Sequence, residues 1–121
     1  MGKTIVICDD EDSLRELIRA ILNGEYRFVE AADGHEGLDL IRRLKPDLVL
    51  ADVMMPRLGG LELLAEVRRD PALGALPVVV VTAFAGQRAA AMEAGADGFL
   101  AKPFDPDELM ATVEELLQTP R

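Results

Sequence analysis

Residues 4–10 read TIVICDD, an apolar run with the pattern of a β-strand that ends directly at a pair of aspartates, Asp9 and Asp10. Three later, mostly apolar runs end in the same way, each directly before a polar residue: 47–51 before Asp52, 78–81 before Thr82, and 98–101 before Lys102. In an open parallel sheet, ligands bind outside the carboxyl ends of the strands, where the strand order reverses. The sequence therefore predicts a binding site in which these polar side chains share one edge of a sheet.

The segments between these runs show helical spacing, which predicts an α/β fold. Helices are expected at about 13–23, 34–44, 61–70, 86–93 and 106–117, with a weaker strand at 26–31. This alternation favours βαβ units that build a parallel sheet with helices on both faces. At 121 residues, of which 50% are hydrophobic, the chain is long enough for one buried core and too short for two ordinary domains.

The first expected helix illustrates the boundary signals. Asp12 or Ser13 is expected to cap its start, and Gly24 to end it. Its apolar face is expected to consist of Leu14, Leu17, Ile18, Ile21 and Leu22. Asp33 has the position of a cap for the second helix, and residues 105–108 place a capping aspartate, a proline and a glutamate at the start of the last one.

Composition argues against several classes of function. No apolar stretch approaches the roughly 20 residues that span a bilayer, and the N-terminus lacks a signal sequence, so we expect a cytoplasmic protein without membrane contact. The net charge is −9 and there is no basic cluster, which argues against direct nucleic-acid binding and leaves proteins as partners. The single cysteine, Cys8, cannot form an internal disulfide and is expected to be a small buried apolar residue.

Aspartates gathered at one edge need a positive partner. Like charges about 4 Å apart repel by roughly 4 kcal/mol at an effective dielectric constant near 20. Mg2+ prefers oxygen ligands and is typically held by one or two carboxylates together with phosphate oxygens, and Lys102 can add a fixed positive charge. Each residue alone has an ordinary interpretation, since aspartates often form turns and threonine is common in strands. Their joint occurrence at successive strand ends favours a site.

Several segments resemble the signature segments of response-regulator receiver domains, with single-domain chemotaxis regulators as the type: residues 7–11, 50–56, 81–83, 95–98 and 101–104. The resemblance extends from residue 3 to residue 117. It implies a flavodoxin-like, doubly wound, five-stranded parallel sheet with strand order 2-1-3-4-5. It also implies that residues 1–121 form one receiver domain without an output domain. Such a domain is a signalling switch rather than an enzyme, and catalyses only its own phosphorylation and dephosphorylation.

The resemblance assigns roles to the acidic residues. It implies that Asp52 accepts a phosphoryl group from a histidine kinase, a phosphotransfer protein or a small phosphodonor. It also implies that Asp9 and Asp10 hold Mg2+ together with Asp52 and the backbone carbonyl of Met54. An ionised carboxylate is already a nucleophile, so this chemistry requires no general base from the protein.

The resemblance also implies a conformational switch. Thr82 and Lys102 would neutralise the phosphoryl oxygens, and a cis peptide between Lys102 and Pro103 would aim the ammonium group into the site. On phosphorylation, Thr82 would move toward the phosphoryl group and Phe99 would turn inward. The surface of the fourth helix, fifth strand and fifth helix would then change for a downstream protein of unknown identity. Phe99 also fits the pattern of an ordinary core aromatic residue.

Two departures from the family pattern modify these expectations. Gly95 follows Thr82 by 13 positions, fewer than is usual in the family, so we expect a shortened fourth helix or preceding loop and an altered output surface. Met54 and Phe84, which flank the expected site, are bulky and apolar. Neither can orient an attacking water and both could shield a phosphoryl group, so we expect slow self-dephosphorylation.

Two other classes of protein share parts of this pattern. A metal-dependent phosphatase could use Asp52 as its nucleophile, but that chemistry usually needs a second acid two residues on, where Met54 stands. A flavodoxin-like flavin-binding protein would need a phosphate-binding loop after the first strand, where the acidic residues 9–12 would repel phosphate. A receiver domain that works without phosphorylation would normally have lost a site residue, and none is missing from this sequence.

Overall fold

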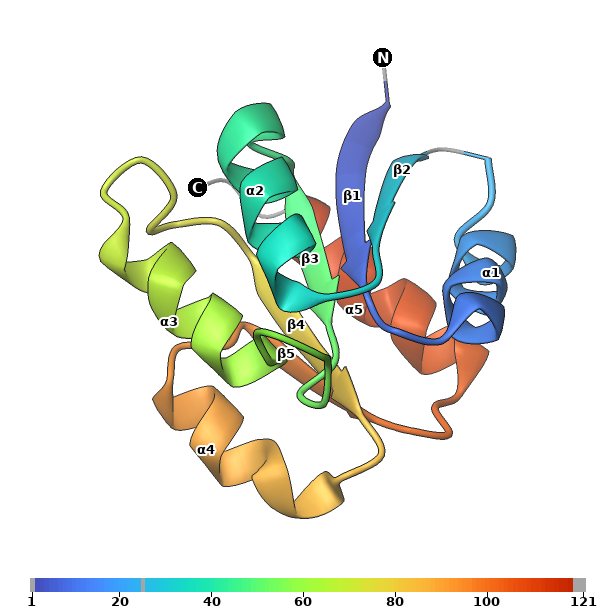
Figure 1. The fold of residues 1–121 in the computed structure, drawn as a ribbon. Coiled ribbons are helices and arrows are strands. Elements are labelled where there is room, and N and C mark those ends of the chain that lie inside the picture. The colour runs from blue at the N-terminus through green and yellow to red at the C-terminus, as the bar shows by residue number, and fades with distance from the viewer. Residues whose placement is uncertain (1, 25, 119–121) are drawn as a thin grey trace.

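The computed structural model describes residues 2–24 and 26–118, and these form a five-stranded parallel sheet with helices on both faces (Figure 1). The strands are β1 (Lys3–Cys8), β2 (Tyr26–Ala31), β3 (Leu48–Ala51), β4 (Val78–Thr82) and β5 (Gly98–Ala101). The helices are α1 (Asp12–Ile21), α2 (Gly34–Leu44), α3 (Gly60–Arg69), α4 (Arg88–Glu93) and α5 (Pro106–Gln118). A 3-10 turn at Ala85–Gln87 leads into α4. The strand order β2-β1-β3-β4-β5 confirms the predicted doubly wound α/β fold.

The register of the strands brings their carboxyl ends together. Cys8 of β1 pairs with Ala51 of β3, and Ala51 pairs with Val80 of β4. Asp9 and Asp52, which follow Cys8 and Ala51, therefore leave neighbouring strands at the same level. The chain steps from β1 to β2 on one side and from β3 to β4 on the other, so the strand order reverses between β1 and β3.

The sheet separates two apolar layers. Side chains alternate along β1, so that Val6 and Cys8 pack toward α2, α3 and α4, while Ile5 and Ile7 pack toward α1 and α5. Both faces are covered, which explains why the strands read as continuous apolar runs. Burial raises the pKa of the Cys8 thiol to about 12, in agreement with its predicted role as a small buried apolar residue. Within the described residues, no helix has the length and apolar character needed to cross a membrane.

The ends of α1 differ from their prediction. The helix begins at Asp12, and Glu11 takes the N-cap position without a side-chain capping bond in the described structure. The prediction of Asp12 or Ser13 as the cap was therefore wrong. Asp12 is already the first helical residue, and its carboxylate accepts a hydrogen bond from the guanidinium of Arg15, one turn later, instead of capping a backbone N–H. The helix ends at Ile21, two residues before the expected end at residue 23.

The predicted apolar face of α1 is correct except at Leu17, whose exposed fraction is 48%. Ile18 is buried against the sheet. Only a stripe of an amphipathic helix is covered by its neighbours, and Leu17 lies at the margin of this stripe. There it lines an open hollow together with Pro103 and Phe104.

The starts of α2 and α5 follow their predictions, whereas the fourth helix is less regular. Asp33 caps α2 by accepting a hydrogen bond from the backbone N–H of Glu36 at 2.8 Å. Asp105 accepts one from the N–H of Asp107 at the start of α5, also at 2.8 Å. The segment expected to be helical over 86–93 opens with the 3-10 turn, and its α-helical part is the six residues of α4. This short helix agrees with the expectation of a shortened segment after β4.

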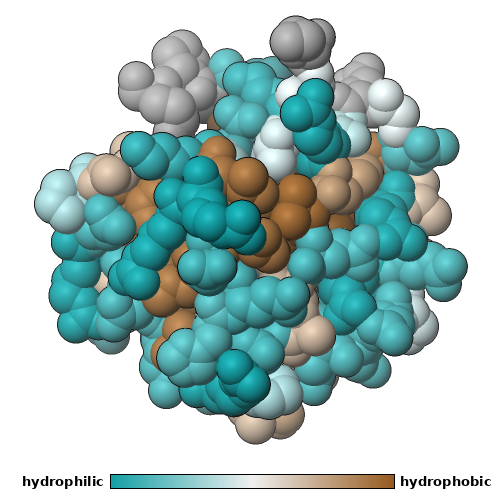
Figure 2. All heavy atoms as spheres, turned by 45° about the horizontal axis from the view of Figure 1, so that its top comes forward, coloured by the Kyte–Doolittle hydropathy of each residue, from teal (hydrophilic) through white to brown (hydrophobic). Residues whose placement is uncertain are grey.

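The end of the molecule opposite to the predicted site is partly apolar. Figure 2 tilts this end toward the viewer and shows apolar groups in the middle of a mainly hydrophilic surface. A hollow at the amino ends of the strands is lined by residues that include Lys3 of β1, Pro77 before β4 and Leu116 of α5. The charged edge predicted from the sequence therefore lies at the far end of the sheet from this apolar surface.

Arg68, in the last turn of α3, connects three segments at this amino-terminal end of the sheet. Its guanidinium donates hydrogen bonds to the carbonyl oxygens of Leu76, at 2.7 Å, and of Gly95, at 2.7 and 3.0 Å. It also pairs with the Asp97 carboxylate at 2.8 Å, which accepts a further bond from the N–H of Val78 at 2.9 Å. Arg68 thus ties α3 to the start of β4 and to the turn between α4 and β5.

We expect Arg68→Met to lower the free energy of unfolding by about 2–3 kcal/mol, because it removes the donors for partly buried carbonyls and for Asp97. Methionine retains the apolar stem, so the loss reports on hydrogen bonds rather than packing. Arg69→Met is the matched control, since the Arg69 side chain is 69% exposed and pairs with Glu66 within the same helix. Its effect should stay within about 0.5 kcal/mol. Urea unfolding measures both, and equal effects of the two variants would contradict this role of Arg68.

Candidate functional site

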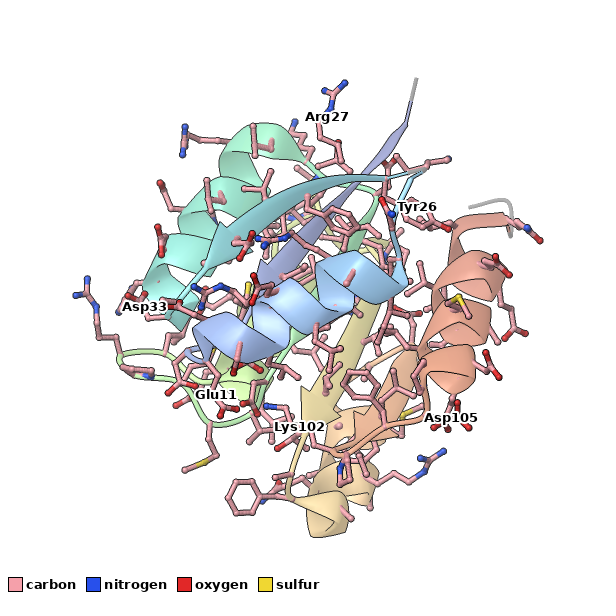
Figure 3. All side chains as sticks on the ribbon, turned by 90° about the vertical axis from the view of Figure 1, so that its right-hand side faces the viewer. Glu11, Tyr26, Arg27, Asp33, Lys102 and Asp105 are labelled. Atoms are coloured by element: carbon pink, nitrogen blue, oxygen red, sulfur yellow. The ribbon has the colours of Figure 1, made fainter. Side chains whose placement is uncertain are left out.

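The predicted site residues lie together at the carboxyl edge of the sheet. In Figure 3, the labelled residues Glu11 and Lys102 lie at one end of the strands, and Tyr26 and Arg27 lie at the other. Thr82 ends β4, and Lys102 follows β5 directly. The structure therefore confirms that these strand ends meet at one edge.

Asp9, Asp10 and Asp52 form a compact acidic cluster. Each offers a carboxylate oxygen, and these oxygens lie within 4.8 Å of one another. Asp9 and Asp52 are buried, whereas Asp10 is exposed. The N–H of Asp9 donates to the carbonyl of Ala31, and that of Asp52 donates to the carbonyl of Cys8, both at 3.0 Å. The sheet hydrogen bonds thus continue one residue beyond β1 and β3 and fix the positions of both buried aspartates.

Lys102 joins the two buried carboxylates. Its ammonium group donates to Asp9 Oδ2 at 2.9 Å and to Asp52 Oδ2 at 3.0 Å. Glu11 Oε1 lies 3.6 Å from the same nitrogen. The peptide between Lys102 and Pro103 is cis, as the sequence predicts. Glu11 was not among the predicted site residues, although the unbroken acidic run at residues 9–12 was a signal for it.

Burial and pairing act in opposite directions on the charged groups of the site. Burial raises the pKa of Asp9 above its usual value, and the hydrogen bonds from the Glu11 N–H and from Lys102 offset only part of this effect. Burial alone would lower the pKa of Lys102, but the bonds to Asp9 and Asp52 and their negative charges raise it. The ammonium group therefore remains charged at neutral pH and compensates the buried carboxylates.

The second carboxylate oxygens of the buried aspartates are held by the backbone. Asp9 Oδ1 accepts a hydrogen bond from the N–H of Glu11 at 2.9 Å, and Asp52 Oδ1 accepts one from the N–H of Met54 at 3.2 Å. A Cβ atom at Gly60 would lie 2.2 Å from the carbonyl oxygen of Asp52, so only glycine lets the start of α3 approach the acidic site so closely. This contact was not predicted from the sequence.

Thr82 and Phe99 occupy buried positions. The Thr82 side chain is fully buried, and its hydroxyl oxygen accepts a hydrogen bond from the N–H of Phe84 at 3.3 Å. The Phe99 ring is also turned inward, with an exposed fraction of 7%, and the guanidinium carbon of Arg88 lies 5.5 Å from its centroid. The ring therefore occupies the core in this structure, in line with the interpretation of Phe99 as a core aromatic.

Met54 and Phe84 are large exposed apolar residues in the loops that follow β3 and β4. Their exposed fractions are 58% and 51%. Met54 lies two residues after Asp52, and Phe84 donates its N–H to the Thr82 hydroxyl. Both predicted flanking residues thus belong to loops that carry site residues.

The donor set suits a hard divalent cation. Carboxylate oxygens are the ligands that Mg2+ prefers, and one or two of them typically suffice because the ion retains several waters. Asp10 is exposed, so the cluster is open to solvent on one side. The site therefore combines oxygen donors for a cation with a buried carboxylate, Asp52, whose charge the Lys102 ammonium group balances.

Comparisons with known sequences identify relatives over nearly the whole chain. The family profile described as "Response regulator receiver domain" matches residues 5–114. Response regulator Rre1 of Synechocystis sp. is 40% identical over 118 residues, which cover 94% of this chain and 51% of that protein. Response regulator MprA of Mycolicibacterium vanbaalenii is 44% identical over 121 residues, which cover 98% of this chain and 52% of that protein. The chain thus spans about half the length of these curated relatives.

Solved structures share the fold at similar coverage. The receiver domain of a sensor histidine kinase from Pseudomonas aeruginosa, with a magnesium ion coordinated in its active-site cleft, has a TM-score of 0.88 at 28% identity. The superposition covers 98% of this chain and 100% of that one. Chemotaxis response regulator CheY4 of Vibrio cholerae has a TM-score of 0.87 at 28% identity and covers 97% of this chain and 100% of that one.

We expect Lys102→Met to lower the free energy of unfolding by about 2–4 kcal/mol in EDTA, because it leaves Asp9 and Asp52 without their shared counter-charge. Addition of Mg2+ should recover part of this loss, since a cation can replace the missing charge. Lys3→Met removes the same charge from an exposed position and is the control. The measurement is urea unfolding with and without Mg2+. A Lys102→Met protein as stable as wild type in EDTA would contradict the proposed charge balance.

Proposed function

The chain belongs to the response regulator receiver domain family, and from this membership we propose that it is a phosphorylation-dependent signalling switch with Asp52 as the phosphoacceptor. The observation that carries the proposal is the bridge from Lys102 to Asp9 and Asp52, at 2.9 and 3.0 Å, beside the exposed carboxylate of Asp10. This arrangement keeps a carboxylate nucleophile, a counter-charge and cation ligands in one place. We further propose that the protein has no catalytic activity on other molecules.

The cation ligands in this proposal are Asp9, Asp10, Asp52 and the backbone carbonyl of Met54. A bound Mg2+ would supply positive charge to the phosphoryl oxygens during transfer. The relative from P. aeruginosa, with magnesium in its active-site cleft, supports this assignment for a site of the same family. The carboxylate oxygens of this chain already lie within 4.8 Å of one another and fit an ion with oxygen ligands.

In the proposed reaction, a carboxylate oxygen of Asp52 attacks the phosphorus atom of the donor. The new P–O bond gives an aspartyl phosphate, and the bond from phosphorus to the donor breaks with its electron pair remaining on the donor. Lys102 then exchanges its bond to Asp52 Oδ2 for one to a phosphoryl oxygen, and the Thr82 hydroxyl donates a second. Positioning and charge neutralisation carry most of the catalysis in such transfers.

The switch proposed for this chain involves the loop between β4 and α4. Phe99 already lies in the core, so its inward rotation is not needed to reach a buried state. The Thr82 hydroxyl bonds to the Phe84 N–H, and a new bond to a phosphoryl oxygen would redirect it and move the loop that leads into the short α4. We propose that the surface of α4, β5 and α5 changes with this loop.

The proposed partners are proteins. The phosphoryl donor is a histidine kinase or a phosphotransfer protein, and the output is a downstream protein that distinguishes the two states of the α4–β5–α5 surface. A metal-dependent phosphatase is less well supported, because the position two residues after Asp52 holds the exposed, apolar Met54. Flavin binding is disfavoured by the carboxylates that crowd the end of β1.

Incubation with Mg2+ and acetyl phosphate should increase the intact mass of the protein by one phosphoryl group. Asp52→Asn should abolish the increase, because an amide is not a competent nucleophile. Beryllofluoride, which mimics the acyl phosphate, should bind the wild-type protein and not the variant. Folded protein that neither gains mass nor binds beryllofluoride would overturn the proposed function.

The aspartyl phosphate should be hydrolysed slowly, because Met54 and Phe84 cannot orient an attacking water. The double variant Met54→Asn, Phe84→Glu places polar groups at both exposed positions and should shorten the phosphorylated lifetime. The decay of phosphorylated protein, followed by intact mass after removal of the donor, measures this. A lifetime equal to or longer than that of wild type would show that these side chains do not control hydrolysis.

A further inference from the structure

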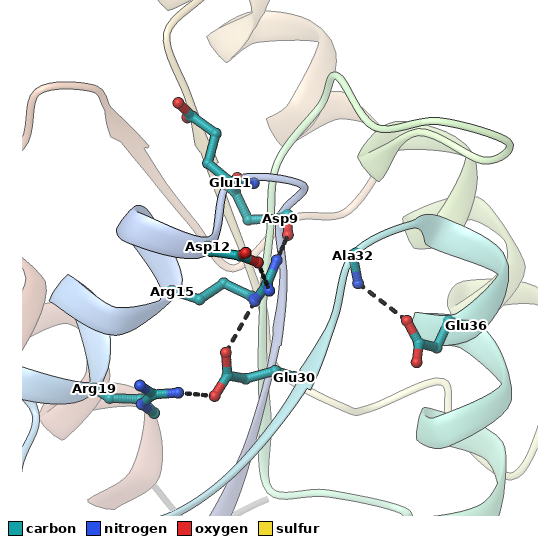
Figure 4. A network of polar contacts seen from close by, with 8 residues as sticks. All are labelled: Asp9, Glu11, Asp12, Arg15, Arg19, Glu30, Ala32 and Glu36. Atoms are coloured by element: carbon teal, nitrogen blue, oxygen red, sulfur yellow. Dashed lines mark hydrogen bonds and ion pairs between the residues drawn. The ribbon is translucent and has the colours of Figure 1, made fainter.

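Arg15, in the first half of α1, reaches back to the acidic loop that follows β1 (Figure 4). One terminal nitrogen of its guanidinium, Nη1, donates a hydrogen bond to the backbone carbonyl of Asp9. The other, Nη2, donates to the Asp12 carboxylate, and Nε donates to Glu30 Oε1 at 2.9 Å. The side chain is only 13% exposed. All three donor nitrogens of the guanidinium are thus engaged, and one of them contacts the backbone of a cation ligand.

The contact with the Asp9 carbonyl orients the neighbouring ligand, Asp10. A peptide unit is planar, so a fixed carbonyl oxygen at Asp9 also fixes the direction in which the chain continues to the nitrogen and Cα of Asp10. Within the described residues, Lys102 pairs with Asp9, Asp52 and Glu11 but not with Asp10. The orientation of the exposed Asp10 carboxylate therefore depends on its backbone. In the described structure, two side chains hold this backbone: the Asp9 carboxylate, which accepts from the N–H of Glu11, and Arg15, which binds the Asp9 carbonyl.

Arg15 is itself held in place from β2. Glu30 accepts from Arg15 through Oε1 and from Arg19, one turn further along α1, through Oε2. This carboxylate, 28% exposed, lies between the two guanidinium groups, as Figure 4 shows. Glu30 therefore anchors Arg15 to β2 through one oxygen, while Arg19 binds the other oxygen of the same carboxylate and, among the described residues, makes no hydrogen bond to the acidic loop.

We propose that Arg15 is a positioning residue for the cation site, which holds the peptide between Asp9 and Asp10 so that the Asp10 carboxylate faces Asp9 and Asp52. The inference rests on the proposed function, because it concerns the Mg2+ site of that proposal. Arg15 acts through geometry and not through its charge. A positive charge near the cluster opposes cation binding, and Asp12 and Glu30 already compensate it. Lysine cannot replace Arg15, because an ammonium group lacks the planar fork that contacts these partners together.

The test is the affinity of the full chain for Mg2+, measured by NMR titration of the 15N-labelled protein at constant ionic strength. Arg15→Met should raise the Kd for Mg2+ by about 10-fold or more, the usual effect of losing a group that orients a metal ligand. Arg19→Met is the matched control, because it removes the same charge and a bond to the same Glu30 but no contact with the acidic loop. Its Kd should stay within about 3-fold of wild type.

The sign of the change separates positioning from electrostatics. Loss of one positive charge by itself favours cation binding, so both variants should bind Mg2+ more tightly if charge alone matters. Weaker Mg2+ binding in Arg15→Met together with unchanged Mg2+ binding in Arg19→Met therefore indicates that the Asp10 ligand has lost its orientation. Amide hydrogen exchange in EDTA adds a readout without metal, since the amide of Glu11, which donates to Asp9 Oδ1, should exchange faster in Arg15→Met alone.

Arg15→Lys provides a second variant that retains the charge and most of the stem. Its ammonium group should pair with Asp12 and Glu30, leave the Asp9 carbonyl and raise the Kd by about 3-fold or more. The NMR spectrum shows whether each variant is folded. An unchanged Kd in either folded Arg15 variant, or an equal loss in Arg19→Met, would overturn the inference. Failure of the wild-type protein to bind Mg2+ would instead overturn the proposed function.

Discussion

Two buried carboxylates share one ammonium group in this protein, and the rest of the structure depends on this balance of charge. Asp9 and Asp52 lie on neighbouring strand ends, each bonded to Lys102, with Asp10 beside them. Without a positive partner, each close carboxylate pair would repel by roughly 4 kcal/mol at an effective dielectric constant near 20. The cluster therefore relies on the Lys102 ammonium group for its counter-charge, and its exposed Asp10 carboxylate leaves it open to a further cation.

The doubly wound sheet provides the geometry for this balance. Because the strand order reverses between β1 and β3, the loops after these strands diverge and leave the buried aspartates open to a ligand. Arginines hold the loops at both ends of the sheet. Arg68 binds backbone carbonyls near the amino ends of β4 and β5, and Arg15 binds the carbonyl of Asp9 at the opposite edge. The chain carries a net charge of −9. In it, these two guanidinium groups pair with carboxylates and also hold backbone carbonyls in place.

The path from the site to the surface is short. Thr82 lies at the end of β4, its hydroxyl bonds to the N–H of Phe84, and the six-residue α4 begins a few residues later. Arg88, the first residue of α4, lies over the buried Phe99 ring and so connects this helix to β5. The chain matches about half the length of its curated relatives. The phosphorylation signal is proposed to reach the α4–β5–α5 surface through this short helix.

Much of this protein was readable from its sequence. The apolar runs and the helical spacing predicted the α/β sheet, and the polar residues after the runs predicted which side chains would meet, because strand ends in a parallel sheet must share an edge. Local rules were less reliable at individual positions. Asp12 has a sequence position that suits a helix cap, but its carboxylate binds the guanidinium of Arg15. Leu17 has the spacing of the apolar face of α1, but it lies at the margin of that face and is half exposed.

What only the tertiary structure decided are the contacts that join different helices, strands and loops. Arg15 on α1 contacts the carbonyl of Asp9 and Glu30 of β2, and Gly60 lies so close to Asp52 that a Cβ atom would clash. The spacing of apolar residues along the sequence does not predict these contacts, because they depend on how the helices pack against the sheet. The sequence by itself thus determined the set of charged groups at the edge, and the packing of the folded chain determined how each of them is held.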